Sequence, residues 1–362
     1  MAQQVLKQTS KQVLKQSVGL DVSKDTVAAC FSQQEIGKPF RILSNRTFSI
    51  SAAGFKQLDE WIVRQHDKTV ALHLLMEATG VYYEELAYFL QGKNYRLSVL
   101  LPNKTSAYAK TLDYKTKNDK TDAKKLAQMS LERELLQWTP PNDTMLKIKR
   151  LCRERAELTD EKVAFKNRLH AKTHAHAPLA QSTKRAKSAL KFLDQQIKEI
   201  EREVKKTVND DPDIKQRMDK VCSIKGVGLI SAATIVAEAN GFALFKNKAQ
   251  LVSFAGYDVV ENKSGSSIES PTKISKRGNH RIRKALHFPA LVAVKHEEQF
   301  KNLYDRVFGK TKIKMKAYVA VQRKLLVLIY TLYKNNAVFN ANFEAELAAK
   351  ISDVAVQPST MK

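Results

Sequence analysis

Four acidic side chains stand where they could bind hard divalent cations. Asp21 lies within the short apolar stretch Val18–Val22, and Glu77 follows a second apolar stretch, Val70–Met76. Asp119 and Asp122 are three residues apart, where a helix is expected to begin. An ionised carboxylate in a buried strand is costly unless something compensates it, and carboxylate oxygens are good ligands for hard cations. Together the four acids predict a site for divalent metal ions.

The Asp119 and Asp122 pair also has a simpler interpretation. Asn118 is a suitable N-cap, and acids in the first turn of a helix interact favourably with its dipole. On the same helix the two acids share a face, so both can also point toward one metal site. Alone, the pair would favour the dipole interpretation. Together with Asp21 and Glu77, it favours the metal site.

The elements that must position these acids alternate between strand and helix over residues 17–142. Strands are expected at Val18–Val22, Thr26–Phe31, Arg46–Ile50, Val70–Met76 and Tyr95–Leu101. Apolar spacing predicts helices at Ala52–Arg64 and Val81–Leu90, and a third from Asp119. This alternation predicts an α/β domain with a mostly parallel or mixed sheet.

Residues 143–210 predict two long, charged helices that fold back on each other. Apolar residues recur in steps of three and four from Leu190 to Val204, which is the pattern of a coiled coil. A looser repeat runs from Ile148 to Leu169, and Pro178 separates the two stretches. We expect a helical hairpin whose apolar seam pairs with another subunit.

Residues 211–345 are expected to be mainly helical and to contact nucleic acid. Gly226 and Gly228 form a Gly-x-Gly turn between two helices, resembling a helix-hairpin-helix in which backbone N–H groups approach a phosphate. A turn without a ligand explains these glycines equally well. Ser264 opens a Ser-Gly-Ser-Ser stretch, usually a flexible linker, but the sequence around it is basic. The candidate nucleic-acid contacts are Lys225, Gly226, Gly228, Lys263, Lys273, Lys276, Arg277, Arg281 and Arg283.

Composition favours an intracellular protein with a polyanionic partner. The 362 residues carry 62 Lys and Arg against 37 Asp and Glu, a net charge of +25, which favours nucleic acid over a membrane surface. No apolar run approaches the roughly 18 residues that span a bilayer, and the start lacks the apolar core of a signal peptide. Three scattered cysteines form no disulfide framework. Residues 1–16 and 346–362 are expected to be tails, the first either frayed or lying on nucleic acid.

The motifs together resemble one family, the DEDD transposases of bacterial insertion sequences (the one-ten/eleven-eleven family, described as bridge-RNA-guided recombinases). They run in family order over nearly the whole chain. They are Gly19-Leu-Asp-Val-Ser-Lys24, Glu77-Ala-Thr-Gly-Val-Tyr82, Lys117-Asn-Asp-Lys-Thr-Asp-Ala123, Gly226-Val-Gly228, Ser264-Gly-Ser-Ser267 and Ile274-Ser-Lys-Arg-Gly-Asn279.

The resemblance implies three parts: an RNase H/RuvC-like α/β domain at 17–142, a helical coiled-coil hairpin at 143–210 and a mainly α transposase domain at 211–345. It implies that Asp21, Glu77, Asp119 and Asp122 bind Mg²⁺ and that Ser264 is the nucleophile, which forms a phosphoserine link to DNA. It also implies donor and target DNA and a noncoding bridge RNA as partners, in the cytoplasm of a bacterium at the nucleoid. The enzyme would be a tetramer, a dimer of dimers, whose subunits share active sites.

Three other interpretations stay open. A RuvC-type nuclease or Holliday-junction resolvase would use the four acids and activated water, without Ser264. A tyrosine recombinase would use His280, Arg283 and Tyr318, although Tyr318 falls on the apolar stripe of a helix expected at Lys316–Tyr333. A binding protein without catalysis would keep its acids for structure alone.

Overall fold

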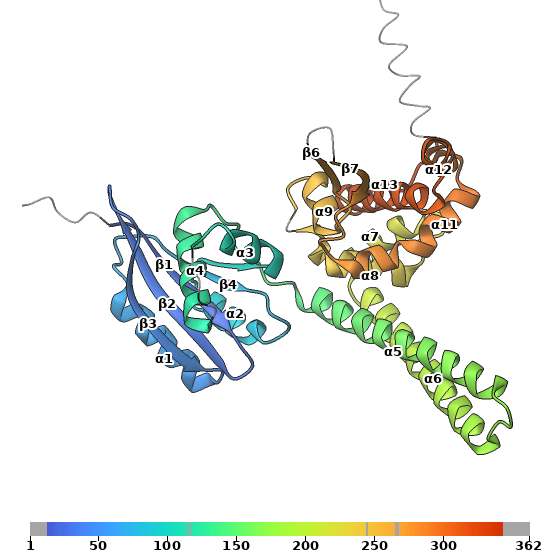
Figure 1. Cartoon of the computed structure of the whole chain (residues 1–362), viewed down its shortest axis with the longest axis horizontal. Coiled ribbons are helices and arrows are strands. Elements are labelled where there is room, and N and C mark those ends of the chain that lie inside the picture. The colour runs from blue at the N-terminus through green and yellow to red at the C-terminus, as the bar shows by residue number, and fades with distance from the viewer. Residues whose placement is uncertain (1–12, 114–115, 117, 244, 265–267, 343–362) are drawn as a thin grey trace, which may run out of the picture. The chain divides into compact units, whose positions relative to one another are not determined.

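The computed structural model describes residues 13–113, 116, 118–243, 245–264 and 268–342, with backbone alone for those of 262–271 that it includes. The chain forms two compact units, residues 1–140 and 141–362 (Figure 1). The first unit is α/β and the second is mainly helical, as the sequence predicted. Within the described residues, no helix is long and apolar enough to cross a membrane.

The first unit is built on a five-stranded mixed sheet in the order β3-β2-β1-β4-β5. β1 pairs antiparallel with β2 and parallel with β4; β2 pairs antiparallel with β3, and β4 parallel with β5. The strands are β1 Val13–Val22, β2 Thr26–Glu35, β3 Arg41–Ser49, β4 Leu72–Glu77 and β5 Leu97–Leu100. The helices are α1 Ala52–Gln65, α2 Tyr83–Gly92, α3 Pro102–Ala109 and α4 Asp119–Glu132.

Side-chain alternation along the strands divides this unit into two layers of core. Val18 and Leu20 of β1 and Leu74 of β4 lie in one cluster with side chains of α1 and α2. On the opposite side of the sheet, Leu75 of β4 packs with residues of α3 and α4. Because successive side chains of a strand point to opposite faces, Asp21 and Glu77 belong to the face that α4 covers.

The second unit begins with a long helical hairpin, α5 Asp143–His174 and α6 Ala180–Asn209 (Figure 1). Ion pairs between Lys147 and Glu203 and between Arg155 and Glu201 join the two helices. The apolar stripe of α6 is buried within the chain: Leu193 is 5 % exposed and Val204 0 %. The seam therefore has its partner inside the chain and does not require a second subunit. The helical hairpin is confirmed, but a coiled coil between subunits is not shown.

The rest of the second unit packs around one core that also includes the first turns of α5. Its elements are α7 Pro212–Cys222, α8 Leu229–Glu238, the short 3-10 helix η1 Asn240–Phe242, α9 Lys248–Phe254, β6 Val259–Ser264, β7 Ile268–Ile274, α10 His280–Ala285, α11 His287–His296, α12 Glu298–Thr311 and α13 Lys314–Asn335. The antiparallel pair of β6 and β7 was not predicted, because the sequence favoured a polar loop there.

Candidate active site

Asp21 and Glu77 sit side by side on adjacent parallel strands. Leu20 of β1 pairs with Met76 of β4, and each acid is the next residue on its strand. Glu77 is the last residue of β4, where the strand gives way to a loop with a left-handed Gly80 (φ 60°). The sheet register therefore brings together two carboxylates that are 56 positions apart in sequence.

Asp122 joins them from α4. Asn118 caps this helix by accepting a hydrogen bond from the backbone N–H of Thr121 (2.8 Å), which confirms the predicted cap. Asp21, Glu77 and Asp122 line one pocket of about 420 Å³, together with residues of α3 and α4. Three of the four predicted acids, from three separate elements, thus face a common cavity.

Asp119 is the exception. It is the first residue of α4, its side chain is exposed, and it does not line this pocket. In the part of the chain that is described, no three His, Cys, Asp or Glu side chains lie close enough to hold a metal ion. The three pocket carboxylates nevertheless form a donor set of hard oxygens around one cavity, which suits a divalent cation. Asp119 stays a predicted ligand.

Three further residues hold the pocket carboxylates, and none of these contacts was predicted from the sequence. The hydroxyl of Thr105 on α3 donates a short hydrogen bond to Oε2 of Glu77, and Thr79 donates to Oε1 (3.3 Å). Lys125 of α4 forms an ion pair with Asp122 (2.7 Å) and is only 14 % exposed. The spacing of Lys125, three residues after Asp122, could have indicated this pair. Thr105 had no such signal, because the sequence showed only that Pro102 ends a strand.

Ser264 lies in the second unit, at the end of β6. Its backbone pairs with Ile268 of β7, so it marks the tip of the β6–β7 hairpin; residues 265–267 and the Ser264 side chain lie outside the described structure. At the base of the hairpin, Ser275 donates its backbone N–H to O of Asp258 (2.8 Å) and its hydroxyl to Oδ1 of the same residue (2.9 Å). These bonds join the two strands at the end opposite Ser264.

A close backbone contact fixes the same base against α9. A Cβ added to Gly278 would lie 2.4 Å from O of Phe254 and 2.6 Å from N of Gly256, so no side chain fits there. Gly256 has a left-handed φ of 73°. Asn279 donates its backbone N–H to O of Phe254 (2.7 Å). The β6–β7 hairpin that carries Ser264 is therefore closely packed against α9 at its base.

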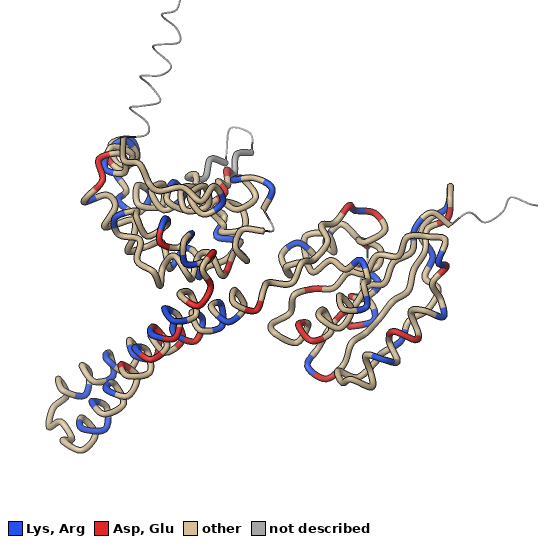
Figure 2. Tube along the Cα trace, turned by 180° about the vertical axis from the view of Figure 1, so that it is seen from behind, with Lys and Arg blue, Asp and Glu red and all other residues tan. Residues whose placement is uncertain are grey.

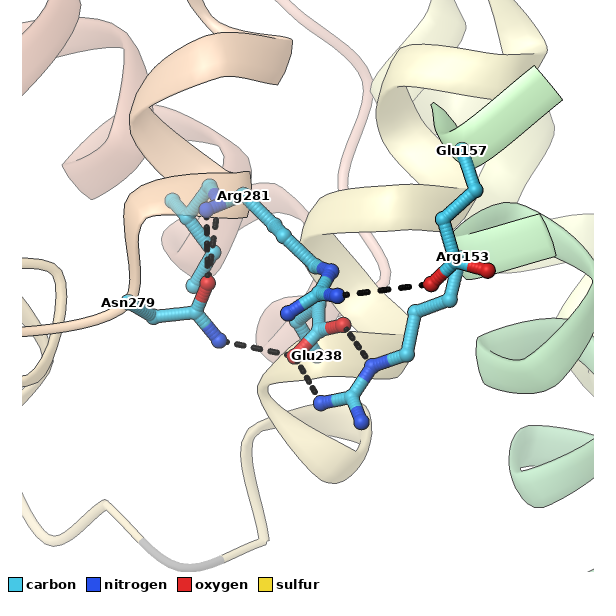
Figure 3. Close-up of polar contacts among 6 residues, drawn as sticks. Arg153, Glu157, Glu238, Asn279 and Arg281 are labelled. Carbon is cyan, nitrogen blue, oxygen red and sulfur yellow. Dashed lines mark hydrogen bonds and ion pairs between the residues drawn. The ribbon is translucent and has the colours of Figure 1, made fainter. Parts of the chain in front are cut away.

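A buried acid, Glu238 at the end of α8, connects this base to the helical hairpin (Figure 3). Its side chain is 2 % exposed and accepts two hydrogen bonds from Arg153 of α5, at 2.6 and 2.9 Å. Asn279, the N-cap of α10, donates to the same carboxylate (2.7 Å). Burial by itself raises the pKa of Glu238, but the Arg153 and Asn279 contacts outweigh it, so the pKa lies below its ordinary value. The sequence could have indicated a buried, paired acid here, because Glu238 is the one charged residue in the apolar helix Leu229–Glu238.

The predicted nucleic-acid contacts divide into two groups. Arg283 donates to O of Ala255 (2.6 Å) and Arg281 forms an ion pair with Glu157 (3.8 Å), so both serve partly in structure. Lys273, Lys276 and Arg277 are exposed beside the hairpin base. The side chain of Lys263 is outside the described residues.

The Gly226 turn has a packing explanation. Gly226 has a φ of 93°, and a Cβ there would lie 2.7 Å from Cβ of Val292 on α11. Lys225 forms an ion pair with the buried Glu297 (3.6 Å). Gly228 is the N-cap of α8 and has nothing within 4 Å of its added Cβ. Phosphate binding at this turn stays a prediction.

The tyrosine of the recombinase alternative is engaged in packing. Tyr318 lies on α13, where its ring is 4.7 Å from that of Tyr304 on α12, measured between centroids. It is partly buried, as its place on the apolar stripe predicted.

In the first unit, Asp21 and Glu77 thus lie on adjacent strands of a mixed sheet, on the face that α4 covers. Residues 18–178 match the family model of DEDD transposases of the IS110 type, described as a transposase, and residues 218–305 match "Transposase IS116/IS110/IS902 family". Together the two models cover more than half of the chain, which belongs to the IS110 family of transposases. Membership implies DNA binding and a divalent metal in the DEDD domain.

Two relatives match this chain over most of its length, and others match a part of it. The "Pilin gene-inverting protein" of Moraxella bovis is 28 % identical over 325 residues, which is 89 % of this chain and 97 % of that protein. The protein of the same name from Moraxella lacunata gives the same values. The "Insertion element IS900 uncharacterized 42 kDa protein" of Mycobacterium paratuberculosis is 27 % identical over 33 % of this chain and 30 % of its own. T. thermophilus RuvC with a Holliday junction substrate matches 31 % of this chain and 90 % of its own, at 14 % identity and a TM-score of 0.23.

Proposed function

We propose that this transposase cuts and rejoins DNA through a covalent phosphoserine intermediate on Ser264, guided by a noncoding bridge RNA from its own element. The observation that supports catalysis most directly is the common pocket of Asp21, Glu77 and Asp122. Carboxylates brought together from the ends of two strands and from a helix repel one another unless a cation joins them. A structural role alone would not need that convergence.

In this proposal the acids bind Mg²⁺, which when bound supplies Lewis-acid stabilisation for a phosphate undergoing displacement. Asp21, Glu77 and Asp122 are the primary ligands, and Asp119 joins them from one turn earlier on α4. Thr105 keeps the Glu77 carboxylate oriented, and Lys125 balances the charge of Asp122. The carboxylates bind metal rather than DNA, since their charge would repel phosphate.

The serine step is a transesterification. The Ser264 oxygen forms a bond to a DNA phosphorus while the bond to one deoxyribose oxygen breaks, and the proton of the serine ends on that oxygen. A deoxyribose hydroxyl of the new partner strand then attacks the phosphoserine, which restores the serine. Each step exchanges one phosphate ester for another, so no external energy source is needed. Lys273, Lys276 and Arg277, exposed beside the hairpin base, are candidates to hold the DNA backbone.

The proposal of RNA guidance is based on the family resemblance and on the net charge of the chain. The proposal of a tetramer is based on the family resemblance. A net charge of +25 fits a protein that binds two polyanions. In the proposed assembly, the carboxylates of one subunit act with Ser264 of another.

DNA inversion is a second candidate outcome of the same chemistry. It is favoured by the two relatives named for pilin gene inversion, which match over 89 % of this chain. Inversion and transposition differ in the arrangement of the DNA ends, not in the bonds made.

A plasmid assay tests the proposal. The reporter carries the DNA that flanks the gene, with its noncoding segment transcribed, and scores excision, insertion and inversion. Asp21→Ala, Glu77→Ala and Asp122→Ala should each abolish recombination and leave RNA binding nearly intact. Wild-type recombination by any of the three would contradict the metal-site assignment. Excision or insertion without inversion would favour transposition over the second candidate.

A further inference from the structure

We infer that the outer face of α6 binds the phosphate backbone of a double-stranded nucleic acid. This surface, here called the α6 basic stripe, consists of Lys184, Lys187, Lys191, Lys198, Arg202 and Lys205. All six are exposed. None of its residues lines the carboxylate pocket or belongs to the β6–β7 hairpin that carries Ser264.

The spacing places these six cations on one side of the helix. With Gln195 they recur in steps of three and four, and four of the lysines, 184, 191, 198 and 205, repeat every seven residues. The opposite side of α6 carries the buried Leu193 and Val204. At 1.5 Å per residue, the stripe extends about 31 Å along the helix.

Three of the four acids of α6 pair with α5, and the fourth, Glu199, accepts hydrogen bonds from Gln195 (3.0 Å) and Gln196 (3.1 Å). Asp194, Glu201 and Glu203 form ion pairs with Lys162, Arg155 and Lys147 of α5. None of the six stripe residues forms an ion pair with any acid that the structure describes. Charge is thus sorted by face: balanced between the helices, and positive on the outside of α6.

The outer half of the hairpin strengthens this asymmetry. No Asp or Glu occurs between Glu161 and Asp194, a segment that holds eight Lys and Arg. Figure 2 shows blue and no red toward the end of the hairpin, and red nearer its base. The exposed residues of α5 closer to the base include Glu154, Glu157 and Asp160, so the two halves differ in charge.

The surface along the stripe is shallowly hollowed. Two adjoining hollows follow the stripe and share Lys187 and Lys191. The hollow nearer the base has a volume of about 560 Å³ and is also lined by Lys198, Arg202 and one acid, Asp194, which forms an ion pair with Lys162 of α5. A row of cations along a hollow can contact successive phosphates of one strand.

The chemistry favours a duplex over a single strand. Sequence-tolerant binding of single strands uses aromatic side chains on which bases stack. The six cations and Gln195 include no aromatic residue, and neither hollow is lined by one. A straight row of lysines reads phosphates and not base edges, so the contact should not depend on sequence. DNA and RNA duplexes share this backbone chemistry.

The test uses the full-length chain with Lys184, Lys191, Lys198 and Lys205 replaced by Gln, which has a similar helix propensity. A matched control replaces the exposed Lys56, Lys68, Lys301 and Lys310 by Gln, so the net charge changes equally. Fluorescence anisotropy measures binding to a 30-bp DNA duplex, an RNA duplex of the same sequence and the single strands, across a range of salt. Circular dichroism checks that both variants stay folded.

The stripe variant should lose about tenfold or more in affinity for a duplex at about 0.1 M salt, with a slope of log K against log salt lower by about 3 to 4. A loss of affinity for the DNA duplex, the RNA duplex or both supports the inference. It also shows which of the two duplexes the stripe binds. Duplex affinity equal to wild type, loss no greater than that of the control, or a larger loss on single strands would overturn it. The assay measures binding without strand exchange, so its outcome is independent of the proposed catalytic mechanism.

Discussion

Gly19 of β1 lies directly beneath Ala123 of α4, so close that an added Cβ would be 2.0 Å from the Ala123 carbonyl oxygen. The same Cβ would be 2.3 Å from the backbone N of Ala127. Ser17 strengthens the contact by donating its hydroxyl to O of Ala127 (2.8 Å). This approach of strand and helix brings Asp122 of α4 into the pocket that Asp21 of β1 also lines.

Gly19→Ala should therefore displace α4 and separate the carboxylates. Because the atoms in contact are backbone, they cannot move aside without shifting the helix, and we expect a loss of about 2 kcal/mol or more in unfolding free energy. Recombination should fall with it. Urea denaturation and the plasmid assay measure the two effects.

Gly309→Ala is the matched control. Gly309 lies within α12 and has nothing within 4 Å of its added Cβ. Alanine there should be neutral or stabilise by about 0.5 to 1 kcal/mol. A Gly19→Ala protein as stable and active as Gly309→Ala would show that β1 and α4 are not held this close.

Thr105 and Lys125 should act as positioning residues for Glu77 and Asp122. Thr105→Val removes the hydroxyl donor and Lys125→Met removes the cation, and each should lower recombination by about 10- to 100-fold. The Mg²⁺ concentration needed for half-maximal activity should rise in Thr105→Val, because Glu77 loses its orientation. Thr105→Ser and Lys125→Arg keep the donor and the charge and should recover much of the activity. Failure of Thr105→Ser to recover more than Thr105→Val would assign Thr105 to packing.

The Arg153 and Glu238 pair should stabilise the second unit. Glu238→Gln leaves the guanidinium facing a neutral side chain and should cost about 3 kcal/mol of unfolding free energy. The exposed pair of Lys215 and Asp219 is the control, since Asp219→Asn should cost no more than about 0.5 kcal/mol.

The cost of Glu238→Gln should depend on pH. The pKa of Glu238 is lowered in the folded protein from its ordinary value of 4.5, so the carboxylate stabilises the fold fully above that pH. As pH falls below 4.5 and then through the folded pKa, the difference between wild type and Glu238→Gln should shrink. A difference that stays constant from pH 7 to pH 3 would contradict the pairing.

The sequence predicted most of the first unit because its strands are buried and alternate. Asp21 and Glu77 each end or interrupt a strongly apolar run, which identified their strands, whereas the register that makes them neighbours was seen only in the structure. The Asn118 cap was predictable for a local reason, since capping involves only three residues of sequence. Thr105 was not, because its partner Glu77 is 28 positions away and no periodicity joins them.

The second unit was harder to predict for two physical reasons. β6 and β7 are short and polar, and β7 contains Pro271, so the hairpin lacks the alternation that marks a strand. The apolar seam from Leu190 to Val204 was predicted, but its partner was not, because a heptad pattern does not distinguish a helix of the same chain from one of another. Leu193 and Val204 are buried within the chain, so the apolar seam no longer indicates that a second subunit must cover it.

In the proposed mechanism Ser264 becomes esterified to a DNA phosphate, and mass spectrometry of a trapped reaction can detect that ester. Wild-type protein, guide RNA and a nicked DNA substrate are quenched during strand exchange, digested and searched for nucleotide-bearing peptides. We expect a nucleotide on Ser264 and, for Ser264→Ala, normal binding of guide and DNA with no adduct and no recombinant product. Cleavage with no protein attached, or a nucleotide on Tyr318, would contradict it.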